Sequence, residues 1–243
     1  MSNTGITRTS VHPNHALICP ESHIPLHFPE LPGCECVVLI SPEMGAKFSQ
    51  TLIQVTAGGI ARPLREADET FLLILEGSVM LSFAGEQHQM ATDDFCYLPP
   101  GPWQADAAQS AQLMTFSKPY IGADAPAAHF SSLRAVPAEP FLGDPDALLQ
   151  VLLPDHPSYD WGINLFQFAP GGTLPQVESH FMEHGLYLLE GQGVYRLGDH
   201  WYPVEAGDTI WMGPFLPQWY AAIGKTPSRY IYYKEMNRPP INA

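Results

Sequence analysis

The sequence predicts an all-β protein made of two copies of one β module. Twenty-five prolines and twenty glycines among 243 residues indicate many turns and strand ends. Short apolar runs are separated by turn residues roughly every eight to twelve positions, which is typical of a sandwich or a barrel. In addition, the second half of the chain repeats the pattern of the first half. These three observations favour a duplicated β-barrel.

The repeat spacing is set by Gly77 and Gly191, which are 114 positions apart. Leu75-Glu76-Gly77 lies over Leu189-Glu190-Gly191. The same spacing places Gly58 on Gly172, Asp94 on Asp208 and Gln104 on Gln218, and with two inserted residues Lys118 falls on Lys234. A repeat sustained in this way indicates a duplicated module.

Four segments follow from this pattern: a proline-rich N-terminal arm (1–45), a first module (46–118), a linker (119–159) and a second module (160–243). We expect strands at 37–40, 48–56, 71–75, 79–83, 94–98 and 113–117, and a short strand or helical turn at 147–153. The β pattern resumes at Trp161 and runs to Tyr233. The histidines of the arm are expected to be solvated or packed rather than bound to metal: His12, His15, His23 and His27.

Composition excludes several classes of partner. The formal net charge is −14 with only 11 Lys and Arg, so we expect binding neither to nucleic acid nor to an anionic membrane surface. We also expect no signal peptide and no membrane span, because no apolar run is long enough. The four cysteines (Cys19, Cys34, Cys36 and Cys96) match no zinc pattern, so free thiols in a reducing cytoplasm are expected.

A cluster of candidate metal ligands lies at Glu178-Ser179-His180-Phe181-Met182-Glu183-His184. If this stretch is a strand, Glu178, His180 and His184 share a parity and face one interior. Two histidines and one carboxylate can hold a divalent metal and leave coordination positions open. The alternative is a solvated strand edge. At the repeat spacing the first module has Leu64, Glu66 and Thr70 at these places, so it is expected to lack the metal site.

Two motifs in the second module resemble those of the cupin superfamily. Gly172, Glu178, His180, His184 and Gly191 have the spacing of the first cupin motif, and Gly198 through Gly207, Asp208 and Pro214 to Gln218 resemble the second. The usual first motif has His, His and Glu, whereas this chain begins with Glu and ends with His. The duplicated chain is therefore identified as a bicupin, with two jelly-roll-like barrels. Cupins host many chemistries, so this resemblance implies a fold and a metal rather than a reaction.

A narrower resemblance covers about residues 170 to 238. The run from His184 to Asp199, the run from Pro217 to Lys225, and Ser228-Arg229-Tyr230 with Lys234 are similar to the (S)-ureidoglycine aminohydrolase family. The first module matches that family in layout but more weakly. The resemblance implies an enzyme of purine and allantoin catabolism that releases ammonia from (S)-ureidoglycine to give (S)-ureidoglycolate.

The family resemblance also implies roles for single residues. The metal, manganese in the family, would be held by Glu178, His180, His184 and Gln218. The substrate is a small ureido carboxylate, and its contacts would be Tyr195, Tyr230, Lys234 and Gln218. Lys234 offers a cation for the carboxylate, and Glu178 is a hypothetical proton acceptor, so these two residues are the catalytic candidates. The ligand types alone leave other divalent metals open.

Two other functions remain open on the residues alone. One is a different metal-dependent cupin enzyme, such as an oxygen-using oxidase or a decarboxylase. The other is a non-catalytic bicupin that binds a small acid. A barrel edge and the proline-rich arm also favour a homo-oligomer.

Overall fold

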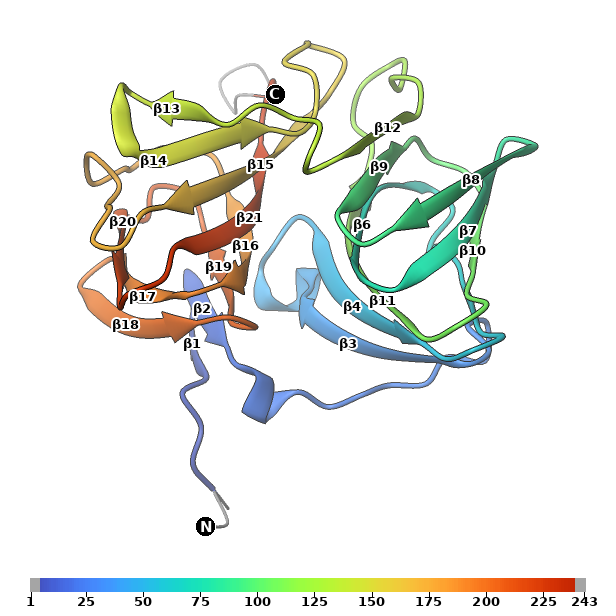
Figure 1. The fold of residues 1–243 in the computed structure, drawn as a ribbon, viewed down its shortest axis with the longest axis horizontal. Coiled ribbons are helices and arrows are strands. Elements are labelled where there is room, and N and C mark those ends of the chain that lie inside the picture. The colour runs from blue at the N-terminus through green and yellow to red at the C-terminus, as the bar shows by residue number, and fades with distance from the viewer. Residues whose placement is uncertain (1–4, 239–243) are drawn as a thin grey trace. The chain divides into compact units, whose positions relative to one another are not determined.

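The computed structural model describes residues 5–238, and these residues divide into two compact units. The amino-terminal unit contains residues 24–43 and 47–136, and the carboxy-terminal unit contains residues 5–23, 44–46 and 137–238. Strands make up nearly all of the regular structure of both (Figure 1). The all-β prediction is therefore confirmed.

The amino-terminal unit consists of two antiparallel sheets. One has six strands in the order β12-β9-β6-β11-β4-β3, and the other has four in the order β5-β10-β7-β8. Their bounds are β3 Cys34–Ile40, β4 Ser49–Val55, β5 Ile60–Ala61, β6 Asp68–Glu76, β7 Ser78–Phe83, β8 Glu86–Ala91, β9 Asp94–Leu98, β10 Trp103–Asp106, β11 Ala111–Pro119 and β12 His129–Ser132. A 3-10 turn, η2, covers Pro42–Met44.

The carboxy-terminal unit also has two antiparallel sheets, of eight and three strands. Their orders are β1-β2-β19-β16-β21-β15-β14-β13 and β18-β17-β20. The bounds are β1 Ser10–His12, β2 His15–Ile18, η1 Pro20–Ser22, β13 Glu139–Phe141, β14 Asp144–Val151, β15 Trp161–Phe168, β16 His184–Glu190, β17 Gln192–Leu197, β18 His200–Glu205, β19 Thr209–Met212, β20 Gln218–Ile223 and β21 Ser228–Glu235.

Sequence reasoning missed several of these strands. β8 has an exposed and mostly polar sequence, and β10 has only four residues, so neither carries a strong apolar signal. The segment expected to be a linker contains β12, β13 and β14. The short strand or helical turn expected at 147–153 overlaps β14, whereas β12 and β13 were not expected. β12 pairs with β9, and β14 pairs with β15. Backbone pairing with long-range partners formed these strands, and a local pattern does not reveal such partners.

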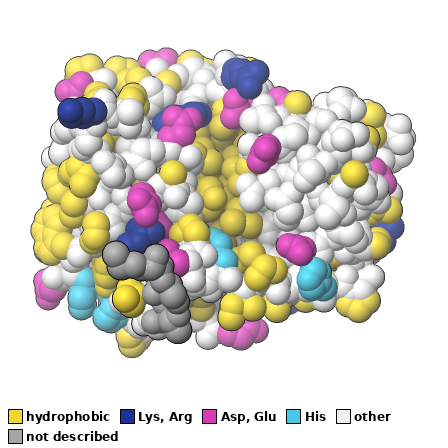
Figure 2. All heavy atoms as spheres, turned by 60° about the horizontal axis from the view of Figure 1, so that its bottom comes forward, with side chains coloured by type: hydrophobic (Ala, Val, Ile, Leu, Met, Phe, Trp, Pro, Cys, Tyr) yellow, Lys and Arg dark blue, Asp and Glu magenta, His cyan; other side chains and the backbone are white. Residues whose placement is uncertain are grey.

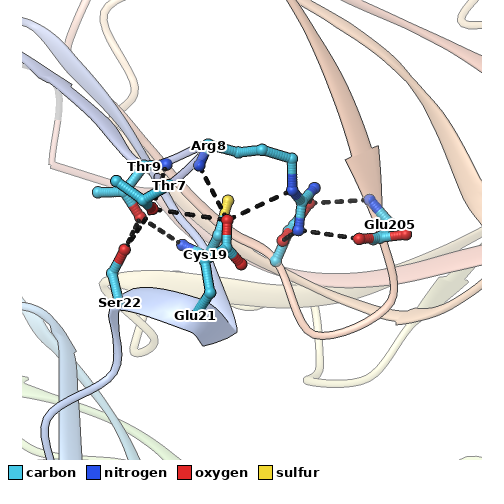
Figure 3. A network of polar contacts seen from close by, with 8 residues as sticks. Thr7, Arg8, Thr9, Cys19, Glu21, Ser22 and Glu205 are labelled. Atoms are coloured by element: carbon cyan, nitrogen blue, oxygen red, sulfur yellow. Dashed lines mark hydrogen bonds and ion pairs between the residues drawn. The ribbon is translucent and has the colours of Figure 1, made fainter. Parts of the chain in front are cut away.

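The first part of the N-terminal arm, residues 5–23, belongs to the carboxy-terminal unit, whereas residues 24–43 belong to the amino-terminal unit. β2 pairs with β19, and β1 pairs with β2 at the edge of the eight-stranded sheet. Arg8 fastens the arm: its guanidinium donates to both carboxylate oxygens of buried Asp208 at 2.7 and 2.9 Å and also contacts Glu205 and Glu21 (Figure 3). The arm thus extends the sheet that contains β16.

Two of the arm histidines pack as expected. His12 and His15 are stacked with ring centroids 4.4 Å apart, and the ring of His200 on β18 lies within 5.3 Å of both. His15 also hydrogen-bonds the hydroxyl of Tyr202 at 2.9 Å. Burial is the main reason that the pKa of His15 is lowered to about 4, with smaller contributions from His12 and His200.

The two units share equivalent turn hydrogen bonds and turn glycines. The Ala91 N–H donates to Asp94 Oδ2 at 2.8 Å, and 114 positions later the Glu205 N–H donates to Asp208 Oδ2 at 2.9 Å. Gly77 and Gly191 both have a positive φ, and a Cβ at either would lie 2.5 Å from a backbone carbonyl oxygen. Glycine is required at these two turns because there is no space for a Cβ atom and because φ is positive.

The strand register corrects three of the aligned pairs. Phe83 pairs with Trp103, whereas Leu197 pairs with Gln218, so Trp103 and not Gln104 occupies the place of Gln218. Likewise Thr70 pairs with Ser117 while His184 pairs with Lys234, so Ser117 and not Lys118 corresponds to Lys234. At the turns with positive φ, Gly58 corresponds to Gly171 rather than to Gly172. Small insertions in the loops shift the spacing, and only the hydrogen-bond ladder reveals the shift.

The remaining general predictions concern cysteines and charge. All four cysteines are free and buried, as predicted, and burial raises the pKa of the Cys36 thiol to about 11. On the face in Figure 2, basic side chains occupy a few scattered positions among acidic, apolar and other side chains. Within residues 5–238, no helix has the length and apolar character needed to cross a membrane.

Candidate active site

The carboxy-terminal unit contains a cavity of about 330 Å³. All the site residues named from the sequence line it: Glu178, His180, His184, Tyr195, Gln218, Tyr230 and Lys234. They come from β16, β17, β20, β21 and the segment before β16. The structure therefore brings together side chains that are up to 56 positions apart between Glu178 and Lys234.

The strand predicted for Glu178 to His184 is wrong, because β16 begins only at His184. The preceding residues are irregular and are held by the other sheet. Glu178 and Gln218 exchange two backbone hydrogen bonds of 2.9 Å, and the Phe215 N–H donates to the His180 carbonyl. The parity argument thus fails for Glu178 and His180, yet the bridge to β20 turns both toward the cavity that His184 lines.

The two histidines face each other across a short gap. His180 Nε2 and His184 Nε2 are 3.3 Å apart, and Glu178 Oε2 is 3.9 Å from His180 Nε2. Two nitrogen ligands about 2.1 Å from one ion, at right angles, would lie about 3 Å apart. The histidine pair therefore has nearly the separation of neighbouring ligands, and Glu178 would need to approach by about 1 Å.

The tautomer of His184 is set by its backbone partner. His184 Nδ1 lies 3.1 Å from the Tyr233 carbonyl oxygen, which only accepts, so Nδ1 carries the proton and Nε2 presents a lone pair. Burial, followed by the neighbouring His180, lowers the pKa of His184 to about 3, so this ring is neutral. A neutral imidazole with an unprotonated Nε2, which here lies 3.3 Å from His180 Nε2, is the form that binds a metal.

The donor set fits a divalent metal. Among residues 5–238 no group of three or more His, Cys, Asp or Glu side chains stands ready to hold an ion. The set at the cavity is instead two imidazoles, one carboxylate and the neutral amide of Gln218, with the carboxylate still too far out. His180 Nδ1 is buried without a hydrogen-bond partner, which leaves this ring free to turn. The residues fit, with Glu178 as the side chain that must move.

Tyr195 orients the amide of Gln218. Its hydroxyl donates to Gln218 Oε1 at 3.0 Å, and both side chains are buried. Burial, followed by the charge of Glu178, raises the pKa of Tyr195 well above its usual value, so Tyr195 remains a donor. An amide oxygen has two lone pairs, so Gln218 could accept from Tyr195 and still bind a metal. Tyr195 therefore supports a candidate ligand in addition to lining the cavity.

The inner face of β21 supplies three cavity residues in a row, at alternating positions: Tyr230, Tyr232 and Lys234. Lys234 is the direct strand partner of His184, and Tyr232 is the direct partner of Asn164 on β15. Sequence reasoning missed Tyr232 and Asn164. The shared parity of Tyr232 with Tyr230 and Lys234 could have revealed it, and Asn164 is a polar residue between apolar neighbours in a strand that is mostly apolar.

The amino-terminal unit has a pocket of about 740 Å³ elsewhere, lined mainly by residues 62–66, 82–85 and 102–104. Leu64 and Glu66 line this pocket, and Trp103 occupies the place of Gln218. Thr70 is buried at the place of His184. None of the described residues here repeats the imidazole pair of the other unit.

Comparison with known proteins identifies the two barrels and the family. A family model of the cupin domain matches residues 164–233, and a model of the EutQ-like cupin domain matches residues 43–120. The (S)-ureidoglycine aminohydrolase of Arabidopsis thaliana is 39% identical over 98% of this chain and 80% of its own length. The (S)-ureidoglycine aminohydrolase of Escherichia coli strain K12 is 31% identical over 93% and 90% of the two chains.

A solved structure gives the same result for the fold. The crystal structure of protein Ylba from E. coli has a TM-score of 0.86 at 28% identity, and covers 98% of this chain and 97% of its own. Two matched cupin domains in one chain define this protein as a bicupin. More narrowly, the extent and identity of the matched relatives show that the chain belongs to the (S)-ureidoglycine aminohydrolase family.

Proposed function

We propose that this chain releases ammonia from (S)-ureidoglycine to form (S)-ureidoglycolate, and that the reaction requires a divalent metal at the carboxy-terminal cavity. Family membership supports the reaction. The observation that carries the metal requirement is the approach of His180 Nε2 and His184 Nε2 to 3.3 Å in the cavity that Glu178 and Gln218 also line. Manganese is proposed from the family resemblance, because these donor types bind several divalent ions.

The net reaction replaces the amine on the central carbon of the substrate by a hydroxyl from water. The C–N bond to the amine breaks, a C–O bond forms, and the departing nitrogen gains a proton. When bound, the metal would supply Lewis acidity and an anchor for the substrate. The chain must then hold the substrate carboxylate, position the reacting carbon and accept a proton.

Lys234 is the proposed partner of the substrate carboxylate, since its ammonium belongs to a half-buried side chain that lines the cavity. Glu178 is the proposed proton acceptor, because its carboxylate lines the cavity and lies 3.9 Å from His180 Nε2. Tyr195 and Tyr230 are buried, neutral hydroxyls that fix the wall of the cavity. Gln218 is proposed as a metal ligand that also faces the substrate.

The test is ammonia release from freshly generated (S)-ureidoglycine by protein stripped of metal and then supplied with manganese. Spontaneous decay of the substrate is subtracted with a control that lacks enzyme. Manganese-dependent release above this control supports the proposal, and so does equal activity without dioxygen. No release by protein that demonstrably holds manganese would reject it.

The double role of Glu178 has its own test. The Glu178→Gln variant keeps an oxygen donor but loses the basic carboxylate, so it should keep much of its metal and lose turnover by about 10²-fold or more. Metal content is measured beside kcat. Unchanged turnover at full metal occupancy would exclude Glu178 as the proton acceptor.

We also propose a cytoplasmic homo-oligomer. The eight-stranded sheet ends in β1 and β13, and such edges favour pairing with another chain unless they are covered. Light scattering on the eluate of a sizing column would give the number of subunits. A monomer at micromolar concentration would reject this part of the proposal.

A further inference from the structure

Asn164 and Tyr232 form a polar pair in the cavity that the ligand set does not use. They are direct partners on β15 and β21, and both line the cavity. The ring of Tyr232 lies against His184 in an edge-on arrangement, with centroids 5.7 Å apart. The pair therefore borders the candidate metal ligands without belonging to them.

The hydrogen bond between the two side chains determines which of their donors and acceptors remain free for a ligand. Asn164 Nδ2 donates to the Tyr232 hydroxyl at 3.1 Å, and within the described part of the chain neither side chain makes another hydrogen bond. The Tyr232 oxygen accepts, so its proton remains available for donation. One of the two N–H groups of the Asn164 amide is engaged, and its Oδ1 remains available as an acceptor. Side by side, the Tyr232 hydroxyl and Asn164 Oδ1 offer one donor and one acceptor.

This arrangement complements a ureido group. A ureido group presents a carbonyl oxygen that accepts and N–H groups that donate, next to each other in one plane. A carboxylate only accepts, so it would leave Asn164 Oδ1 unpaired and face its partial negative charge. Asn164 is buried, and an unpaired buried acceptor is costly, so a ligand without N–H groups would bind less well here.

The position of Lys234 gives the ligand a direction. Lys234 follows Tyr232 by two residues on the same face of β21, about 7 Å along the strand. A small ligand with a carboxylate at one end and a ureido group at the other spans a comparable distance. We propose that Asn164 and Tyr232 form the subsite for the ureido group, with Lys234 at the carboxylate end. This inference rests on the proposed function and assigns the two ends of its substrate.

The test compares two ligands that differ only in the ureido group. Dissociation constants of (S)-ureidoglycolate and glycolate are measured by calorimetry on manganese-loaded protein. The wild type should bind ureidoglycolate about tenfold or more tightly than glycolate. Asn164→Leu and Tyr232→Phe should each reduce this preference about tenfold while the affinity for glycolate stays within about twofold. Lys234→Met should weaken both ligands to a similar degree.

Matched controls lie outside the cavity lining, on β15 itself and on β16, which pairs with β21. Gln167→Leu on β15 and Tyr187→Phe on β16 should leave both affinities unchanged. Retained glycolate binding shows that a variant is folded. Tyr232→Phe removes a single oxygen atom, so it serves as the second variant if Asn164→Leu disturbs the strand.

The outcomes separate the two proposals. An unchanged ligand preference in both variants, or a wild type that does not prefer ureidoglycolate, overturns the subsite whether or not ammonia is released. A loss of preference in the variants supports the subsite even if wild-type protein releases no ammonia, which would reject the proposed function alone.

Discussion

The two units share one scaffold but differ in what fills it. At places that the strand register makes equivalent, the carboxy-terminal unit has His184, Tyr195, Gln218, Tyr230, Tyr232 and Lys234, whereas the amino-terminal unit has Thr70, Leu81, Trp103, Leu113, Thr115 and Ser117. Leu81, Trp103 and Leu113 belong to the apolar core of the amino-terminal unit. The first barrel is thus closed by packing, while polar side chains line a cavity in the second.

The comparison indicates that the fold itself does not require the polar cluster. The shared turns, such as those at Gly77 and Gly191, keep their backbone geometry in both units. Buried polar groups are costly unless they are paired, and the amino-terminal unit forms the same barrel with Leu81, Trp103 and Leu113 in the places of Tyr195, Gln218 and Tyr230. The cluster in the carboxy-terminal unit is therefore best explained by chemistry rather than by stability.

The largest expected effect comes from exchanging the residue at one equivalent position. Gln218→Trp places the indole of the first barrel into the second, where it removes a candidate ligand and fills the cavity. We expect loss of metal binding and a decrease in kcat/KM of about 10³-fold or more. Metal content and ammonia release are the measurements.

The matched control for that exchange is Trp103→Phe in the amino-terminal unit. It should lower stability and leave the activity of the folded protein unchanged. Normal metal content and activity in Gln218→Trp would break the distinction between the two barrels.

A smaller effect is expected from the residue that orients Gln218. Tyr195→Phe removes the hydroxyl that donates to Gln218 Oε1 at 3.0 Å. Loss of such a supporting hydrogen bond typically lowers metal affinity about 10- to 100-fold. Metal titration with a competing chelator measures this change, and Tyr220→Phe, a buried tyrosine outside the cavity lining, is the control. Equal affinities in both variants would remove Tyr195 from the support of the site.

A third difference between the two units concerns how much an equivalent aspartate stabilises each of them. Asp94 and Asp208 make the same turn hydrogen bond, but only Asp208 also receives two bonds from Arg8. Asp208→Asn should therefore destabilise more than Asp94→Asn, by about 2 kcal/mol, since Asp208 is buried and its partner would lose a charge-assisted contact. Thermal unfolding should show a midpoint lower by roughly 4–8 °C. Equal midpoints would mean that Arg8 adds nothing at the turn.

The smallest expected effect is a dependence of stability on pH. The pKa of His15 is lowered to about 4 in the folded state, mainly by burial, so below about pH 6.5 the unfolded chain binds a proton that the folded chain excludes. Stability from this group is complete above pH 6.5 and is lost as the pH falls toward 4. The loss is about 1 kcal/mol at pH 5.5.

His15→Gln should flatten this part of the profile, measured by urea unfolding at pH 7.5 and 5.5. The metal-free protein has a second contribution of the same sign from His184, whose pKa is also lowered. The wild type and the His15→Gln variant are therefore both measured in the metal-loaded form. An identical slope in the variant would remove His15 as the source.

The sequence alone determined the fold class, the duplication and the identity of the candidate ligands. Turn residues and apolar runs are local properties, and the glycines at 77 and 191 follow from local backbone geometry. Three candidate ligands lie within seven residues, so their proximity could be expected from the sequence.

The tertiary structure alone decided how those residues are held and which of them correspond between the units. Glu178 faces the cavity through its bridge to Gln218 rather than through strand parity. Trp103 opposes Gln218 because a hydrogen-bond ladder, and not residue spacing, sets the register. The pairing of Asn164 with Tyr232 became visible only from the two adjacent strands. The physical reason is that register, side-chain direction and burial depend on contacts between residues far apart in the chain.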